Sequence, residues 1–136
     1  MTTVILDSEA ITALRKPASA KGRAVLAALE VVPAQRKRRR INAHAIVPTT
    51  VRVEAHWNRR DPAAATLNRL PILDSTLTSD IANHASDIVE STGVSVADAH
   101  IAALVATSGQ PAVVVTSDPR DIERASAPHR VRVIRL

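Results

Sequence analysis

The chain contains no cysteine, and Trp57 is its only aromatic residue. Without cysteine it can form neither a disulfide nor a thiolate zinc site, and it cannot use a cysteine nucleophile. Proteins that bind single-stranded nucleic acid usually stack bases on Phe, Tyr or Trp, so a stacking platform of that kind is excluded as well. Any contact with RNA must therefore be mainly ionic or mediated by a metal.

The chain also lacks any run of about 18 apolar residues that could span a membrane. Its start, Met-Thr-Thr-Val-Ile-Leu-Asp, has neither the basic flank nor the small-residue cleavage site of a signal peptide. We therefore expect a cytoplasmic protein with no membrane partner. Its 136 residues are enough for one hydrophobic core, so we expect a single domain over residues 1–136.

Several α/β enzyme classes are disfavoured because their motifs are missing. There is no Gly-x-x-x-x-Gly-Lys loop, no Gly-x-Gly-x-x-Gly turn and no Gly-x-Ser-x-Gly elbow, which argues against nucleoside triphosphatases, dinucleotide enzymes and serine hydrolases. A phosphoacceptor receiver domain would need a lysine late in the chain, whereas the lysines here stop at Lys37.

Positive charge is abundant: the formal net charge is +5 and the isoelectric point is near 11. Such a field attracts polyanions, although the excess of arginine over lysine is also what a GC-rich coding sequence produces. The densest run is expected to connect the second helix to the next strand. It is either a solvated loop or an RNA-binding segment, and it comprises Arg36, Lys37, Arg38, Arg39 and Arg40.

Short β-rich runs alternate with helical patterns along the chain. Strands are expected near residues 3–7, 42–47, 70–73, 112–115 and 131–134, and helices in most of the intervening segments. Thr49 or Thr50 is expected to cap one helix and Ser95 another, while Gly93 ends the helix before Ser95. Strands separated by helices predict an α/β fold with a mainly parallel sheet of about five strands, flanked by helices.

Four acidic residues fall where this topology would bring them together. Asp7 and Asp118 follow predicted strands, and Glu54 and Asp98 lie in helices that start from the same rim of the sheet. Ligands of open parallel sheets bind beyond the carboxyl ends of the strands. Because converging carboxylates repel each other and any phosphate, the cluster predicts a site for a divalent cation such as Mg²⁺.

Each acid also has a structural interpretation. Asp7 could cap the following helix, Asp118 could cap a helix that begins with Pro119 and has Asp121 at its third position, and Asp98 has capping-box spacing from Ser95. Glu54 lies deeper in its helix, where capping explains it poorly. Taken together, the four acids favour a metal site over capping alone.

The order of the motifs Val4-Ile5-Leu6-Asp7-Ser8, Val47-Pro48 with Glu54 six residues on, Asp98-Ala99-His100-Ile101-Ala102-Ala103-Leu104 and Val115-Thr116-Ser117-Asp118-Pro119-Arg120-Asp121 resembles that of the PIN-domain nucleases. Within that family it is most similar to the VapC-type toxins of bacterial toxin–antitoxin pairs. The resemblance covers essentially the whole chain. Its last two motifs are the most specific, and the basic run is longer than the usual connection.

The resemblance implies a PIN-like five-stranded parallel sheet, Mg²⁺- or Mn²⁺-dependent endoribonuclease activity on an RNA substrate, a cognate antitoxin and a homodimer. It carries the catalytic quartet over to Asp7, Glu54, Asp98 and Asp118. Asp121 matches a further acid of the last motif, and Thr116 matches its hydroxyl residue.

From the chemistry of phosphodiester hydrolysis we assign Asp7, Asp98 and Asp118 as metal ligands, with Asp121 supporting a second ion or the outer shell. Glu54 would orient or deprotonate a water molecule, and Thr116 would hydrogen-bond a ligand carboxylate or a phosphate oxygen. Two alternatives stay open: a non-catalytic PIN-like binding module, and a PIN nuclease of ordinary RNA maturation. His100 is expected to be a packing or surface residue, and Trp57 a core-packing residue.

Overall fold

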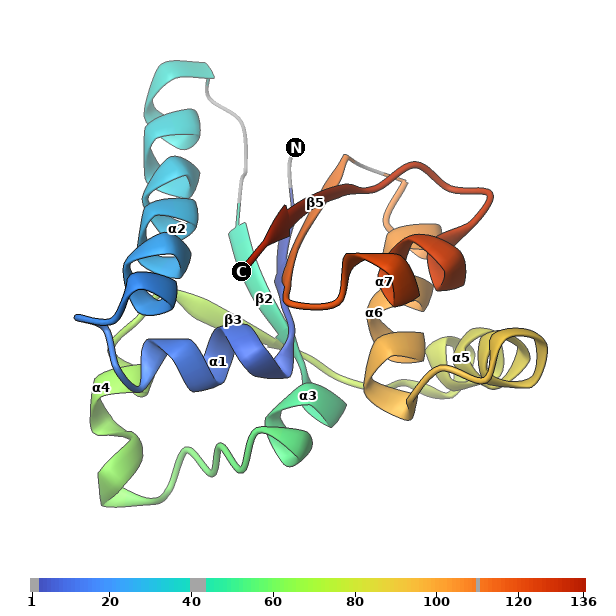
Figure 1. Ribbon diagram of the computed structural model, residues 1–136, viewed down its shortest axis with the longest axis horizontal. Helices are drawn as coiled ribbons and strands as arrows, with labels where there is room; N and C mark the ends of the chain where they lie inside the picture. Colours follow the sequence, from blue (N-terminus) through green and yellow to red (C-terminus); the bar gives the residue numbers. More distant parts are fainter. Residues whose placement is uncertain (1–2, 40–43, 110) are drawn as a thin grey trace.

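Five parallel strands lie side by side in the order β3-β2-β1-β4-β5 (Figure 1). The computed structural model describes residues 3–39, 44–109 and 111–136. All four neighbouring pairs are parallel, as the sequence predicted. The strands are β1 (Thr3–Leu6), β2 (His44–Pro48), β3 (Ile72–Ser75), β4 (Ala112–Thr116) and β5 (Arg132–Arg135).

Helices cover both faces of this sheet. α1 and α2 pack together on one side, and α5, α6 and α7 lie on the other (Figure 1). The helices are α1 (Ser8–Leu14), α2 (Ala20–Arg39), α3 (Thr49–Glu54), α4 (Ala65–Asn68), α5 (Ser79–Thr92), α6 (Val96–Thr107) and α7 (Pro119–Ser126), with a 3-10 turn η1 (Pro62–Ala64) before α4. The predicted α/β class, with a five-stranded parallel sheet, is confirmed.

The core lies around the two central strands. Ile5 and Leu6 of β1 and Val114 and Val115 of β4 are completely buried, as expected for strands covered on both faces. Among the described residues no single helix is long and apolar enough to cross a membrane. α5 and α6 together reach the required length and composition, but the chain bends by 118° between them.

The helix boundaries follow the predicted caps in part. Gly93 ends α5 in the left-handed conformation with φ of 71°, and the Ser95 hydroxyl caps α6. The prediction that Thr49 or Thr50 caps α3 is wrong, because α3 starts directly after Pro48 and has no side-chain cap. The Thr49 hydroxyl instead accepts a hydrogen bond from the Leu77 N–H, and Thr50 contacts His100.

The basic run is not the connecting loop that the sequence suggested. α2 extends to Arg39, so the backbone of residues 36–39 is helical, while Arg40 lies outside the described residues. Cations near a helix C-terminus interact favourably with the carbonyl end of the helix dipole, which gives the run a structural reason to be there.

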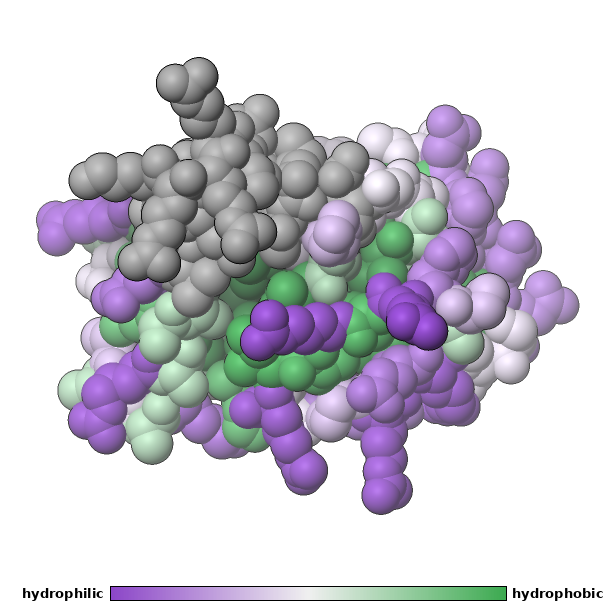
Figure 2. All heavy atoms as spheres, turned by 90° about the horizontal axis from the view of Figure 1, so that it is seen from above, coloured by the Kyte–Doolittle hydropathy of each residue, from purple (hydrophilic) through white to green (hydrophobic). Residues whose placement is uncertain are grey.

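The sheet ends on one side with β5, an edge strand that carries exposed arginines. Arg132 and Arg135 are exposed, whereas Val133 and Ile134 between them are partly buried against the core. Charged residues on an edge strand discourage pairing with another chain. Figure 2 shows the molecule from above relative to Figure 1. In this view, hydrophilic side chains cross a band of hydrophobic residues.

Candidate active site at the carboxyl ends of the strands

The strand order reverses at β1, since the chain continues from β1 to β2 and β3 on one side and places β4 and β5 on the other. In open parallel sheets, ligands bind at such a switch point, beyond the carboxyl ends of the two strands that flank it. Asp7 follows β1 directly, and Thr116 is the last residue of β4. The topology therefore places these two side chains at the position where a ligand is expected.

Asp7 is held by three donors in a buried position. Its carboxylate caps α1 by accepting a hydrogen bond from the Ala10 N–H at 2.8 Å, and the side chain is 6% exposed. Burial raises the pKa of Asp7 above its ordinary value, and hydrogen bonds from Thr116, Ala10 and Ser117 oppose that rise. Asp7 is thus an N-cap, as its structural interpretation predicted, and it is also a buried carboxylate at the switch point.

The Thr116 hydroxyl joins the ends of β1 and β4. It hydrogen-bonds the Asp7 carboxylate and accepts a hydrogen bond from the Asp118 N–H at 2.9 Å. Asp118 in turn caps α7 by accepting from the Asp121 N–H at 3.4 Å. Asp121 is paired with Arg124 at 2.9 Å, so its charge is partly balanced within α7.

Glu54 is the last residue of α3 and is exposed. A carboxylate at the C-terminus of a helix faces the negative end of the helix dipole, so this position does not stabilise the helix. The Ser8 hydroxyl, from the first turn of α1, donates a hydrogen bond to Glu54 Oε1 at 2.7 Å. The sequence analysis did not identify Ser8 as a site residue, although it directly follows Asp7.

Asp98 provides the evidence that the acids lie near one another. It is the third residue of α6, and its N–H donates to the Ser95 hydroxyl at 3.1 Å. Burial raises the pKa of Asp98 to about 6, the Ser95 hydrogen bond opposes this, and repulsion from Glu54, Asp7 and Asp121 adds to it. The charges of Glu54, Asp7 and Asp121, from two other helices and a strand end, therefore act on the Asp98 carboxylate.

The donor set has the chemistry of a hard-cation site. Asp7, Glu54, Asp98 and Asp118 have no ion pair with any basic side chain in the described part of the chain. Within the same residues, no group of three or more His, Cys, Asp or Glu side chains is close enough to hold a metal ion. Carboxylate oxygens without a counter-charge are donors of the type that Mg²⁺ and Mn²⁺ prefer, but their spacing among the described residues does not form a metal-binding group.

His100 lies on α6, two residues beyond Asp98, and is completely buried. Its Nδ1 is 2.8 Å from the Thr50 hydroxyl of α3, and its Nε2 has no hydrogen-bond partner among the described residues. Burial lowers the pKa of His100 to about 4. Of the two expected places, packed or on the surface, the structure shows the packed one, and it adds a direct link between the helices that carry Glu54 and Asp98.

Trp57 is a core residue, as expected, with 2% of its surface exposed. Its indole N–H donates to Asn68, and the guanidinium groups of Arg52 and Arg59 lie 5.8 and 4.1 Å from its ring centre. Both arginines pair with Asp74. Trp57 therefore cannot serve as a platform for base stacking.

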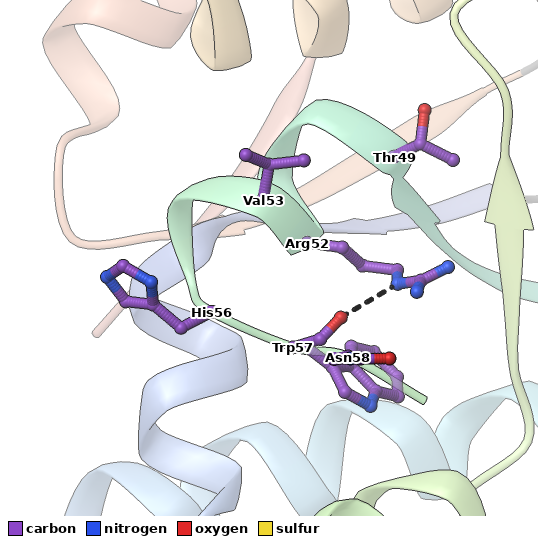
Figure 3. Close-up of a pocket in the computed structure, with 6 residues that line it drawn as sticks. All are labelled: Thr49, Arg52, Val53, His56, Trp57 and Asn58. Atoms are coloured by element: carbon purple, nitrogen blue, oxygen red, sulfur yellow. Dashed lines mark hydrogen bonds between the residues drawn. The ribbon is translucent and has the colours of Figure 1, made fainter. Parts of the chain in front are cut away.

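A hollow of about 500 Å³ borders α3 beside this cluster. In Figure 3 the Arg52 side chain runs toward Trp57, whose carbonyl accepts a hydrogen bond from Arg52 Nε at 3.2 Å, and Val53 projects from the helix in another direction. The lining residues are Thr49, Arg52, Val53, His56, Trp57 and Asn58. The hollow is next to Glu54 in sequence but contains none of the five acids.

The fold is similar to that of chains in three solved complexes. A chain in the crystal structure of VapBC2 from Rickettsia felis bound to a DNA fragment from their promoter matches with a TM-score of 0.63 and 15% identity, over 98% of both chains. A chain of FitAcB from Neisseria gonorrhoeae matches with a TM-score of 0.57 and 18% identity, over 96% of both chains.

A chain of FitAB bound to an IR36 DNA fragment matches with a TM-score of 0.59 and 15% identity, over 97% of this chain and 94% of that one. No protein-family model and no curated protein sequence matches the chain. At these identities the likeness establishes the fold alone, so we conclude that the chain has the same α/β fold as these chains of the VapBC2, FitAcB and FitAB complexes.

Proposed function

We propose that this chain is a Mg²⁺- or Mn²⁺-dependent endoribonuclease that acts as the toxin of a toxin–antitoxin pair and is neutralised by a cognate antitoxin. Its main support is the repulsion that Glu54, Asp7 and Asp121 exert on the Asp98 carboxylate at the switch point of a parallel sheet, with no ion pair to Asp98, Glu54 or Asp7 among the described residues. Further support is the likeness in fold to chains of VapBC and FitAB complexes over nearly the full length.

Each acid would have a separate task in phosphodiester hydrolysis. Asp7, Asp98 and Asp118 would hold the ion, and Asp121, already paired with Arg124, would support it from outside. The bound ion would activate a water molecule and neutralise charge on the phosphate. Glu54 would orient or deprotonate the attacking water through Oε2, because Oε1 is engaged by Ser8.

The cation should also decide when the site can accept RNA. Four carboxylates at one rim repel a phosphodiester, so the RNA backbone would approach only after the ion has compensated their charge. Thr116 would keep Asp7 oriented through this change, since its hydroxyl bonds that carboxylate from β4.

The first test is cleavage of a pool of structured RNAs by the purified, antitoxin-free protein with Mg²⁺ or Mn²⁺. EDTA and the Asp98→Asn variant serve as controls, because an amide at residue 98 keeps the shape of the carboxyl group and removes its charge. Cleavage that requires both metal and Asp98 supports the nuclease. Full activity of a folded Asp98→Asn protein would remove Asp98 from the site.

The toxin role needs a separate test in cells. Overexpression should arrest growth, and co-expression of a small protein encoded next to this chain should relieve the arrest. Growth arrest that no neighbouring protein relieves would favour a nuclease of RNA maturation, and RNA binding without cleavage under any metal condition would favour a binding module. We also propose a homodimer, which light scattering of the purified chain tests directly.

A further inference from the structure

α3, the helix that carries Glu54, has little stability of its own. It is six residues long, its N-cap is Pro48, and no side chain caps its first turn. A helix this short does not form in isolation, so its position depends on contacts with the rest of the molecule. The Thr49 hydroxyl accepts a hydrogen bond from the Leu77 N–H, and Arg15, the residue after α1, donates to the carbonyls of Ala55 and His56 just beyond α3.

One further contact joins α3 to the helix that carries Asp98. The Thr50 hydroxyl lies 2.8 Å from Nδ1 of His100 on α6. Residues four apart lie on the same face of a helix, so Thr50 is one turn from Glu54 on the face that bears it. His100 and Asp98 are two residues apart and so lie on roughly opposite sides of α6. The contact therefore lies one helical turn from Glu54 and two residues from Asp98, on the side of α6 away from Asp98.

Packing alone gives no reason for a histidine at this position. His100 is completely buried, and its Nε2 has no partner among the described residues. An apolar side chain would fill this space without leaving a polar atom unpaired, which is unfavourable in a buried position. A directional bond to Thr50 is what histidine provides and leucine does not.

We propose that the Thr50–His100 hydrogen bond positions α3 against α6 and so sets the separation of Glu54 and Asp98 at the proposed cation site. His100 and Thr50 are positioning residues that do not touch the metal or the RNA. This inference rests on the proposed function, because it assigns the contact a role at the proposed metal site. It also makes a statement about geometry that can be measured without metal or substrate.

The first measurement uses the absence of cysteine. Val53 directly precedes Glu54 and is 77% exposed, and Val96 lies two residues before Asp98 and is 59% exposed. Figure 3 shows Val53 projecting from α3. The substitutions Val53→Cys and Val96→Cys therefore allow specific spin labelling at both positions. Dipolar EPR between the labels should give a narrow distance distribution. Thr50→Val should broaden or shift it, and Thr50→Ser, which keeps the hydroxyl, should not.

Thr49→Val is the matched control. It removes a hydroxyl hydrogen bond from the same turn of α3, but that bond goes to Leu77 and not to α6. If Thr49→Val changes the 53–96 distance as much as Thr50→Val does, the bond to His100 has no particular positioning role and the inference is overturned.

The second measurement is Mn²⁺ affinity of the unlabelled full chain, by calorimetry without RNA. Thr50→Val should weaken binding about tenfold, as loss of a supporting contact typically does, and Thr50→Ser should restore it. The double variant Thr50→Val/His100→Leu replaces both partners by apolar groups, so it should regain stability in urea while its Mn²⁺ affinity stays low.

These results separate the inference from the proposed function. If the wild-type chain binds no Mn²⁺, the metal site is wrong and the role assigned to the contact is wrong with it. If the wild-type chain binds Mn²⁺ and Thr50→Val, or the stable double variant, binds it equally well, the metal site stands and the positioning role is overturned.

Discussion

The Ser8 hydroxyl lies 2.7 Å from Glu54 Oε1 and joins the start of α1 to the end of α3 across 46 residues of sequence. The preceding residue, Asp7, uses its own side chain to cap α1. Asp7 and Ser8, two consecutive residues after β1, thus both belong to the rim. Asp7 is a candidate metal ligand, and Ser8 orients Glu54, the candidate base. The geometry of Glu54 is therefore tied to the end of the central strand.

Ser8→Ala is expected to lower metal-dependent RNA cleavage about tenfold, because Glu54 loses the donor that fixes its carboxylate. Stability should change by less than about 1 kcal/mol, since the bond is exposed. Single-turnover cleavage and urea unfolding of the two proteins provide the comparison. Ser8→Thr retains the hydroxyl and should remain active. Equal rates for Ser8→Ala and wild type would show that Glu54 needs no orientation from α1.

The positions of the acids could be predicted from the sequence because each lies at a boundary between elements. Asp7 and Asp118 follow strands rich in Val, Ile and Leu, and the parallel topology sends such positions to one rim. The contacts that orient the acids could not be predicted. The sequence separation is 46 residues between Ser8 and Glu54 and 50 residues between Thr50 and His100. A local sequence pattern does not indicate pairs that far apart.

Two local predictions failed for physical reasons. Thr49 and Thr50 have the residue type of an N-cap, but their hydroxyls make tertiary contacts with Leu77 and His100 instead. The basic run was expected in a connection, yet α2 continues through Pro33 to Arg39. Proline lacks the N–H of the helical ladder and usually ends a helix, so local propensity gave the wrong boundary.

Asp98→Asn is expected to stabilise the metal-free chain at neutral pH. The pKa of Asp98 is about 6 in the folded chain against an ordinary value of 3.8, so the folded state favours the protonated carboxyl. Wild type therefore loses stability as the pH rises from about 4 through 6, and the variant does not. Above that range the variant should be more stable by about 1–2 kcal/mol, allowing for solvent screening.

Only the wild type of these two proteins should respond to metal. Mg²⁺ should raise the melting temperature of wild type, because ion binding to the folded state relieves the repulsion among the acids. It should leave Asp98→Asn nearly unchanged. Thermal melts at pH 4.5 and 7.5, with and without Mg²⁺, test both effects. A variant that is less stable than wild type at pH 7.5 would show that the charge on residue 98 is not under strain.

Thr116→Val is expected to destabilise the chain by about 1–3 kcal/mol. The buried hydroxyl bonds the Asp7 carboxylate and accepts from the Asp118 N–H, so valine leaves two polar groups without their partner. Thr116→Ser keeps both bonds and should recover most of the loss. Urea unfolding measures the difference, and a threonine-to-valine change without effect would mean that water replaces the hydroxyl.

A salt titration can separate two alternative roles of the basic run at the end of α2. If Arg38 and Arg39 contact RNA phosphates, replacing both by Ala should weaken RNA binding and flatten its dependence on salt, with the slope reduced by about one for each lost contact. If they serve only the helix dipole, RNA affinity should stay constant while helix stability falls by about 0.3–1 kcal/mol per charge.

Lysine at both positions is the control, because it retains the charge and should preserve the salt slope if the run contacts RNA phosphates. RNA binding measured in Asp98→Asn, which cannot cleave under the proposed function, keeps the substrate intact during the titration. An unchanged slope for the alanine variant would assign the run to the stability of α2, and the RNA path would then have to be sought elsewhere on the molecule.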